Sequence, residues 1–313
     1  MYNFIIRFIA CFIVDKQQRR NFRKKHCYHK NGINIAMITD DNYVMPTLVC
    51  IQSIKNNCSG KLNIHVFVNN VSPKNINSLK SVSSKSCDII IYNCEDIINK
   101  YLTIDVNRHV SVTAIIKFFL PTMLNYLDKI LYLDSDILVK GDLTILYKTN
   151  ISNKYAAVVK DVLCIKNHQY MDSIGIKNQY YFNSGVMLLN LTKMRENNIT
   201  KKLIDYRMNV KQHFMDQDAF NAIIGDNVIY MSYKYNFLPY YMTVMTRKQL
   251  TDFFEEEIPD CFWKIYESSI ILHLGGAEKP WWQDMGYLSN LYKKYYIDML
   301  HNLNKKSIKN VKR

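Results

Sequence analysis

Two aspartates, Asp134 and Asp136, flank Ser135 within the apolar run 128–139. The run has strand length and contains no glycine or proline, which predicts a buried strand. Side chains two residues apart in a strand point to the same face, so the two carboxylates would converge. Burying both without a counter-charge is costly, and carboxylate oxygens bind hard divalent ions. The pair therefore predicts a Mg²⁺ or Mn²⁺ site at the end of a core strand, where open α/β sheets bind ligands.

A second group of candidate ligands lies near the end of the chain. His273 closes the apolar stretch 270–273 and is followed by the Gly275-Gly276 pair and by Lys279. Alone, such a histidine is more typical of a hydrogen-bonded core residue. A Gly-Gly turn, however, lets backbone amides approach an anion, and a lysine supplies a compact positive charge. Together they suit a diphosphate beside a metal, and an imidazole ligand shifts the preference from magnesium toward manganese.

Three further polar groups can each be interpreted as structural or as functional residues. Residues 40–42 are Asp-Asp-Asn and follow the first strand, where they predict either a turn or a nucleoside contact. Residues 216–218 are Asp-Gln-Asp, which favours either a helix N-terminus or a site. Asn183 lies inside an apolar strand, where its buried amide needs partners that a polar ligand could supply.

The elements that must position these residues alternate between strand and helix. The βαβαβ start predicts a parallel sheet and an α/β fold. Hydrophobic periodicity and the capping and turn residues give the boundaries. The expected strands are 33–38, 62–68, 88–92, 155–160, 181–190, 227–231 and 270–273, and the main expected helices are 72–84, 112–126, 200–211 and one that begins at 216–218.

The net charge of +14 on 313 residues is concentrated at the two ends. Residues 1–30 hold eight basic side chains and one acid, and residues 291–313 hold seven and one, so the body between them is close to neutral. A nucleic-acid-binding face would be basic across the fold. The division expected is a segment 1–30, a domain 31–285 and a basic, aromatic tail 286–313, with both extensions helical.

The N-terminal segment is predicted to lie on a membrane surface. Its apolar stretch is too short to span a bilayer, and most of its positive charge follows the stretch instead of preceding it, unlike a signal peptide. Apolar residues at helical spacing followed by a basic cluster favour an interfacial anchor at the cytoplasmic face of the inner membrane, although a helix packed on the protein's own core gives the same pattern. The eight cysteines have no regular spacing, which indicates reduced thiols.

Six motifs occur in order along the chain. They are Thr39-Asp40-Asp41-Asn42-Tyr43, His109-Val110-Ser111, Leu131-Tyr132-Leu133-Asp134-Ser135-Asp136, Tyr181-Phe182-Asn183-Ser184-Gly185-Val186, Asp216-Gln217-Asp218 and His273 to Trp281. In order and spacing they resemble glycosyltransferase family 8, in particular the bacterial lipopolysaccharide galactosyl- and glucosyltransferases. The resemblance covers residues 33–285 and implies the GT-A fold, a Rossmann-like, mostly parallel sheet flanked by helices.

The resemblance implies an enzyme that transfers a hexose from UDP-galactose or UDP-glucose to an oligosaccharide or lipid-linked acceptor. Its implied metal ligands for manganese, or for magnesium, are Asp134, Asp136 and His273. Its implied nucleotide and phosphate contacts are Ile38, Asp40, Asn42, His109, Val110, Ser135, Gly276 and Lys279. Its implied sugar-site residues are Lys117, Asp161, Asn183, Asp216 and Gln217.

One position departs from the family pattern. Members usually have a tyrosine and an arginine where this chain has Ile115 and Lys117. Lysine keeps the charge but loses the bidentate geometry of arginine. The family retains anomeric configuration, and Gln217 is an amide and a poor nucleophile, so we expect same-face attack rather than a covalent intermediate. The competing hypothesis is a catalytically degenerate protein that uses its basic tails on membranes or nucleic acid.

Overall fold

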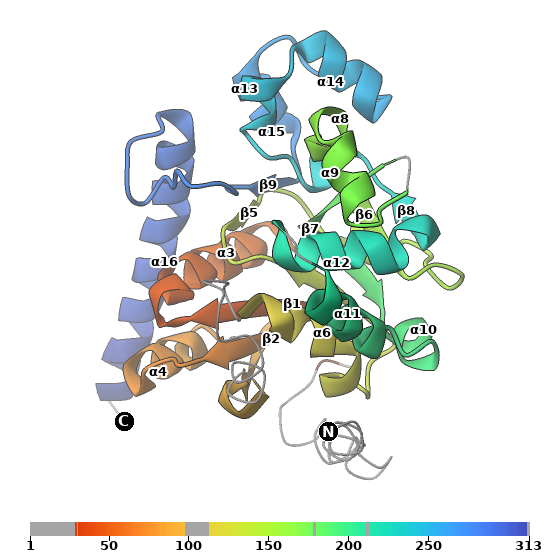
Figure 1. Ribbon diagram of the computed structural model, residues 1–313. Coiled ribbons are helices and arrows are strands. Elements are labelled where there is room, and N and C mark those ends of the chain that lie inside the picture. Colours follow the sequence, from red (N-terminus) through yellow and green to blue (C-terminus); the bar gives the residue numbers. More distant parts are fainter. Residues whose placement is uncertain (1–28, 30, 98–112, 178–179, 211–212, 312–313) are drawn as a thin grey trace.

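The computed structural model describes residues 29, 31–97, 113–177, 180–210 and 213–311, and a seven-stranded sheet forms its centre (Figure 1). The strand order is β3-β2-β1-β4-β7-β6-β8. The strands are β1 (Ile33–Asp40), β2 (Leu62–Asn69), β3 (Cys87–Asn93), β4 (Lys129–Leu133), β6 (Ala156–Lys160), β7 (Phe182–Asn190) and β8 (Val228–Tyr230).

The sheet is mostly parallel. β1 pairs in parallel with β2 and β4, β2 with β3, and β6 with β8, whereas β7 is antiparallel to both β4 and β6. Within the described sheet β7 alone is reversed, so its first residues lie at the edge where β4 ends. The predicted α/β class, the mostly parallel sheet and the strands named from the sequence are confirmed, with the exception of the run 128–139.

Both faces of the sheet are buried, which explains why its strands are apolar almost throughout. In β1, Ile35 and Met37 belong to one core cluster and Ala36 and Ile38 to the other. Figure 1 shows α3, α4 and α16 on one side of the sheet and α6, α10, α11 and α12 on the other. These helices are α3 (Val44–Asn57), α4 (Pro73–Ser81), α6 (Thr113–Met123), α10 (Leu191–Glu196), α11 (Ile199–Asn209), α12 (Met215–Ile224) and α16 (Tyr287–Val311).

Figure 1 shows α8, α9, α13, α14 and α15 together at the top of the view, beyond the seven-stranded sheet. Other remaining elements are two short strands, β5 and β9, and a short helix, α7. The bounds of all these elements are β5 (Ile137–Val139), α7 (Thr144–Lys148), α8 (Leu163–Lys166), α9 (His168–Ser173), α13 (Tyr241–Val244), α14 (Arg247–Phe254), α15 (Phe262–Ser268) and β9 (Ile271–His273).

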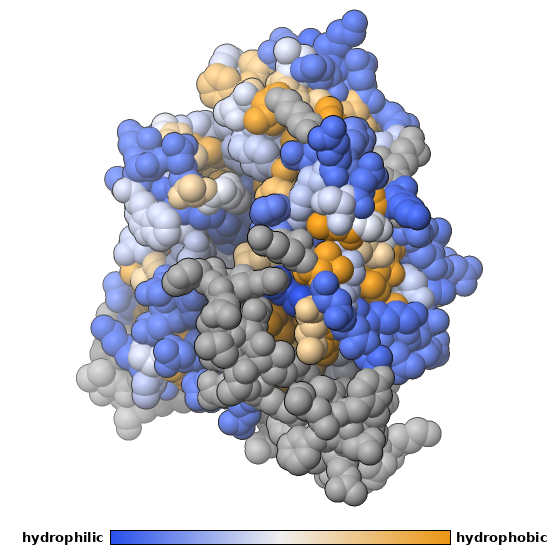
Figure 2. All heavy atoms as spheres, viewed as in Figure 1, coloured by the Kyte–Doolittle hydropathy of each residue, from blue (hydrophilic) through white to orange (hydrophobic). Residues whose placement is uncertain are grey.

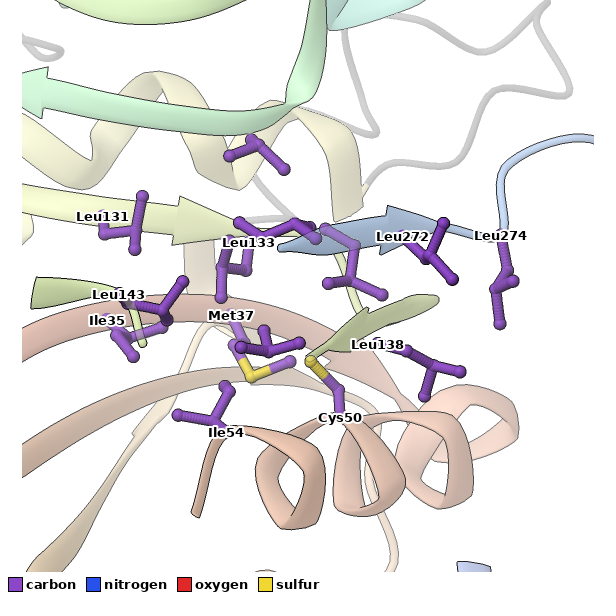
Figure 3. Close-up of a cluster of buried hydrophobic side chains, with 14 of the residues drawn as sticks. Ile35, Met37, Cys50, Ile54, Leu131, Leu133, Leu138, Leu143, Leu272 and Leu274 are labelled. Atoms are coloured by element: carbon purple, nitrogen blue, oxygen red, sulfur yellow. The ribbon is translucent and has the colours of Figure 1, made fainter. Parts of the chain in front are cut away.

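The run 128–139 is not one strand, and that part of the prediction was wrong. β4 ends at Leu133, residues 134–136 form a turn, and β5 pairs antiparallel with β9 in a separate two-stranded sheet. Figure 3 shows why the second apolar stretch is still buried: Leu138 and Leu272 pack with Cys50 of α3 in the same cluster as Leu133. Apolarity alone could not show this break, because both halves of the run are buried.

The C-terminal helix α16 begins as part of the core. Tyr292, Tyr295 and Met299 are buried, and the Asn57 amide of α3 donates to the Tyr295 hydroxyl at 3.0 Å. The two buried tyrosines are therefore unavailable for stacking on nucleic-acid bases. The segment 1–30 lies outside the described residues except for His29.

Two other expectations concern compartment and membrane. Cys50, Cys58, Cys87 and Cys94 are buried free thiols, and Cys261 is a partly exposed one. For these five cysteines this agrees with the predicted reduced state. Among the described helices, none combines the length and the apolarity needed to cross a bilayer.

Candidate active site

The turn between β4 and β5 is fixed from three sides. The Asp134 amide donates to the Gly185 carbonyl of β7 at 2.8 Å, and the Leu274 amide donates to the Asp136 carbonyl at 2.8 Å. The Ser135 hydroxyl donates to the Ile38 carbonyl of β1 at 2.8 Å. The backbone of the turn is therefore held where the carboxyl ends of β1 and β4 meet β7 and β9.

Asp134, Asp136 and His273 form a cluster that can hold a metal. One ligand atom from each lies within 4.8 Å of the others, and His273 Nε2 is 3.2 Å from Asp136 Oδ1 and 3.7 Å from Asp134 Oδ2. Two carboxylates and one imidazole fit a divalent cation such as Mn²⁺. The two aspartates do converge as predicted, but they do so across a turn.

The orientation of His273 is set by Asn236. β9 pairs His273 with Ile137, which brings the ring beside the aspartate turn, and His273 Nδ1 lies 3.1 Å from Asn236 Oδ1. If Nδ1 carries the proton and donates it to Asn236, Nε2 faces the carboxylates as a free ligand. Asn236 is fully buried, and its amide donates to Asn183 Oδ1 at 2.9 Å. Sequence reasoning missed Asn236, which follows a tyrosine-rich stretch with no recognisable motif.

Gly185 leaves the space that the cluster occupies. A Cβ atom at this position would lie 2.2 Å from His273 Cε1 and 2.7 Å from Asp134 Oδ2. No side chain fits there without displacing a candidate ligand. The motif Asn183-Ser184-Gly185 therefore has two functions, because Gly185 admits the metal cluster and Asn183 belongs to the neighbouring polar network.

Two buried lysines neutralise the acids. Lys117 Nζ lies 2.7 Å from Asp216 Oδ2 and 3.1 Å from Asp134 Oδ1. Burial lowers the pKa of Lys117, but the two aspartates outweigh burial and hold this pKa above its usual range. Lys279 Nζ lies 2.5 Å from Asp136 Oδ2. Burial raises the pKa of Asp136, but His273 and Lys279 outweigh it and hold this pKa well below its usual range.

The predicted sugar-site residues are brought together in one buried hydrogen-bond network. The Asn183 amide donates to Asp161 Oδ2 at 3.1 Å and to Gln217 Oε1 at 3.0 Å, and the Gln217 amide donates to Asp161 Oδ2 at 3.3 Å. The Tyr240 hydroxyl donates to Asp161 Oδ1 at 3.0 Å. Burial raises the pKa of the Asp161 carboxyl, and these hydrogen bonds oppose the rise.

This network is connected to the metal cluster at two points. Asn236 joins His273 to Asn183, and Lys117 joins Asp134 to Asp216. Ser184 joins Asp216 to Gln217, because its hydroxyl donates to Asp216 Oδ2 at 2.8 Å and its backbone amide donates to Gln217 Oε1 at 3.1 Å. A molecule bound between the metal cluster and this network would contact residues of both. All five predicted sugar-site residues therefore lie in one continuous polar assembly beside the metal cluster.

The loop before α12 fixes how Asp216 and Gln217 enter the network. Met215 has a left-handed backbone with φ of 47°. The fully buried Asp218 accepts hydrogen bonds from the Tyr170 hydroxyl at 2.5 Å and the Tyr181 hydroxyl at 2.6 Å. Asp218 therefore anchors the turn, while Asp216 faces Lys117. Sequence reasoning did not separate these roles, because both aspartates are typical of a helix N-terminus.

A cavity of about 360 Å³ opens beside the aspartate turn. Its wall includes Ile38 and Asp40 from β1 and Lys117 from α6, together with the aspartates and Ser135. Asp40 also accepts the Tyr43 amide at 3.0 Å as the cap of the following turn, so its turn role is confirmed. This volume falls within the range of small-molecule sites.

Two predicted nucleotide and phosphate contacts, Asn42 and Gly276, do not line this cavity. Asn42 is exposed and lines a separate groove, not this cavity. Gly276 is exposed with φ of 105°, a left-handed conformation that favours glycine, on the loop between His273 and Lys279. His109 and Val110 lie outside the described residues.

On the face shown in Figure 2, apolar side chains reach the surface over α12, and Phe214 at its start is 39% exposed.

Comparison with known proteins agrees with this geometry. The model of the family described as glycosyl transferase family 8 matches residues 34–285. A lipopolysaccharide 1,2-glucosyltransferase of Escherichia coli K12 is 27% identical over 293 residues, which cover 91% of this chain and 83% of that protein. A Haemophilus influenzae protein described as a glycosyltransferase is 30% identical over 224 residues, covering 70% and 67% of the two chains. The crystal structure of the galactosyltransferase LgtC with donor and acceptor sugar analogues superposes with a TM-score of 0.70 at 25% identity, covering 85% of this chain and 96% of that one.

Proposed function

The chain belongs to glycosyltransferase family 8, which supports the expected hexosyltransferase activity. We propose that it is a retaining, manganese-dependent enzyme. The donor is UDP-galactose or UDP-glucose. The acceptor is a core oligosaccharide or a related lipid-linked surface glycan. The observation that carries the proposal is the cluster of Asp134, Asp136 and His273 beside a buried network of amides and carboxylates.

The three cluster residues would hold Mn²⁺, with Mg²⁺ as the other candidate. When bound, the metal supplies positive charge that stabilises the diphosphate leaving group. Lys279 is buried against Asp136 and adds a cation on the same side. Ile38, Asp40 and Ser135 line the cavity in which the nucleotide would lie, with Gly276 on the adjoining loop. His109, Val110 and Asn42 remain predicted nucleotide contacts on sequence grounds alone.

The sugar-site residues would position the transferred hexose by hydrogen bonds. Asp216 is paired with Lys117, and Asp161 and Asn183 hold Gln217 between them. In this arrangement Gln217 Oε1 already accepts hydrogen bonds from the Asn183 amide and from the Ser184 backbone. An amide oxygen that is engaged twice is a poor nucleophile. We therefore favour attack by the acceptor hydroxyl from the face that the diphosphate leaves.

A release assay tests this function. Purified protein is expected to release UDP from UDP-galactose or UDP-glucose with Mn²⁺, and Asp136→Asn is expected to abolish release because it removes a ligand charge. The matched control is Asp252→Asn, an exposed acid on α14. Metal-dependent release that is unchanged in Asp136→Asn would contradict the metal assignment. Mass spectrometry that finds a glycosyl adduct on Gln217 or Asp216 would contradict same-face attack.

We also propose that the basic segment 1–30 holds the enzyme at the cytoplasmic face of the inner membrane, which would place the active site near a lipid-linked acceptor. The support is its apolar stripe and basic cluster. Deletion of residues 1–25 is expected to move the enzyme from vesicles of anionic lipid into the supernatant with UDP release intact. Full retention on the vesicles would contradict this assignment.

A further inference from the structure

A second concave site lies behind the wall of the proposed donor cavity. It is a groove of about 860 Å³ between the start of α3 and α16, closed by the loop that carries Trp281 and Trp282. Met45 and Pro46 form its α3 side, and Lys293 belongs to its α16 side. Apart from Asn42, which is a predicted nucleotide contact, no residue that lines this groove has a role in the proposed transfer reaction.

The groove and the cavity share one wall. Tyr43 lines the cavity, Trp281 lines the groove, and their rings meet edge to face with centroids 6.2 Å apart. Asn42, adjacent to Tyr43, faces the groove. A molecule in the groove would therefore lie next to the donor site without entering it.

The groove offers an exposed aromatic surface. Trp282 is 67% exposed and stands at 71° to Trp281 with ring centroids 5.9 Å apart, and Met45 beside them is 41% exposed. Such large apolar side chains gathered in one concave site indicate a binding function. The faces of indole rings are electronegative, so they pack well against the slightly positive C–H groups on one face of a pyranose ring.

The polar residues of the groove are neutral as a set. The side-chain amides of Asn42, Gln283 and Asn290 make no hydrogen bond to any other described residue. Each of these side chains offers two N–H donors and an oxygen acceptor. Asp284 and Lys293 contribute one charge of each sign. A phosphate or an anionic lipid would require an excess of positive charge. Free amides beside exposed indoles match instead a neutral, polyhydroxylated ligand.

We propose that this groove binds a neutral oligosaccharide. Resting on the proposed function, the bound saccharide is the part of the acceptor that lies away from the reacting hydroxyl. Trp282 supplies the stacking surface, and the side-chain amides of Gln283 and Asn290 bind hydroxyl groups. The site adds affinity for long acceptors and takes no part in donor cleavage.

The test is saturation-transfer NMR with three probes: lactose, maltotriose and dephosphorylated core oligosaccharide of lipopolysaccharide. The wild type is expected to bind at least one of them. Trp282→Ala is expected to weaken that binding by about tenfold, the effect of losing one aromatic contact of roughly 1.4 kcal/mol. Trp282→Phe restores most of it because it keeps an aromatic face. The matched control is Trp263→Ala, since Trp263 on α15 is 47% exposed and lies outside the groove.

Three results would overturn the proposal: no binding of any probe, equal loss in Trp263→Ala, or displacement of the saccharide by UMP with Mn²⁺, which would place it in the donor cavity. UDP release without acceptor separates this inference from the proposed function. If release occurs and no saccharide binds, the groove assignment fails alone. If a saccharide binds through Trp282 and no release occurs with either donor, the proposed function fails and the groove stands.

Discussion

Gly185→Ala adds a single methyl group where the metal cluster is most crowded. The new Cβ would lie 2.2 Å from His273 Cε1, 2.8 Å from His273 Nδ1 and 2.7 Å from Asp134 Oδ2, whereas ordinary contacts are 3.4–4 Å. The Gly185 backbone cannot withdraw easily, because its carbonyl accepts the Asp134 amide at 2.8 Å. The His273 ring must therefore move, against its contact with Asn236 at 3.1 Å.

The expected magnitude follows from this overlap. Overpacking a buried site costs about 1–3 kcal/mol of folding free energy. Displacing a ligand from its supporting hydrogen bond weakens metal binding by about 10- to 100-fold, which corresponds to roughly 1.4–2.7 kcal/mol. We therefore expect a folded protein with weakened Mn²⁺ binding and a matching loss of UDP release at limiting metal.

Calorimetric titration with Mn²⁺ measures the loss, and circular dichroism with urea unfolding checks the fold. Gly60→Ala is the matched control, because a Cβ at Gly60 meets nothing within 4 Å and its backbone is not left-handed. Gly185→Ala protein that binds Mn²⁺ as tightly as the wild type would refute the geometry of the cluster. Equal loss of binding in Gly60→Ala would show that the effect is not local.

Three other changes have defined outcomes. Lys117→Met leaves Asp134 and Asp216 without their shared cation, so urea unfolding should show a loss of about 3–5 kcal/mol in the free energy of unfolding. Lys117→Arg, which keeps the charge, should stay near the wild type. Equal stability of the two variants would contradict the ion pairs. Asn236→Ala removes the hydrogen-bond partner of the imidazole and should weaken Mn²⁺ binding by about 10- to 100-fold in calorimetry, with intact affinity counting against the proposed orientation. Burial raises the pKa of the Cys94 thiol from 9.0 to about 12, so above pH 9 the thiol ionises in the unfolded state but not in the folded state, and the free energy of unfolding falls. Between pH 8 and pH 10, urea unfolding should therefore show a smaller fall in Cys94→Ala than in the wild type. An equal fall in both proteins would contradict this.

The sequence determined the sheet and most of the chemistry. Strands that are buried on both faces are apolar throughout, so their positions could be identified without tertiary information. Asp134 and Asp136 were identified as candidate ligands because two acids in such a run require a cation. Asn183, Asp216 and Gln217 were candidate site residues from the polar pattern, whereas Lys117, Asp161 and the sugar-site role of all five came from the family resemblance. The structure brings the five together.

Only the tertiary structure decided how these residues meet. The aspartates converge through a turn between two sheets, because β5 leaves β4 to pair with β9 and thereby delivers His273. The roles of Gly185 and Asn236 depend on contacts between segments far apart in the chain, and no local pattern encodes such contacts. Composition and periodicity report burial, whereas the meeting of distant side chains is set by strand order and register.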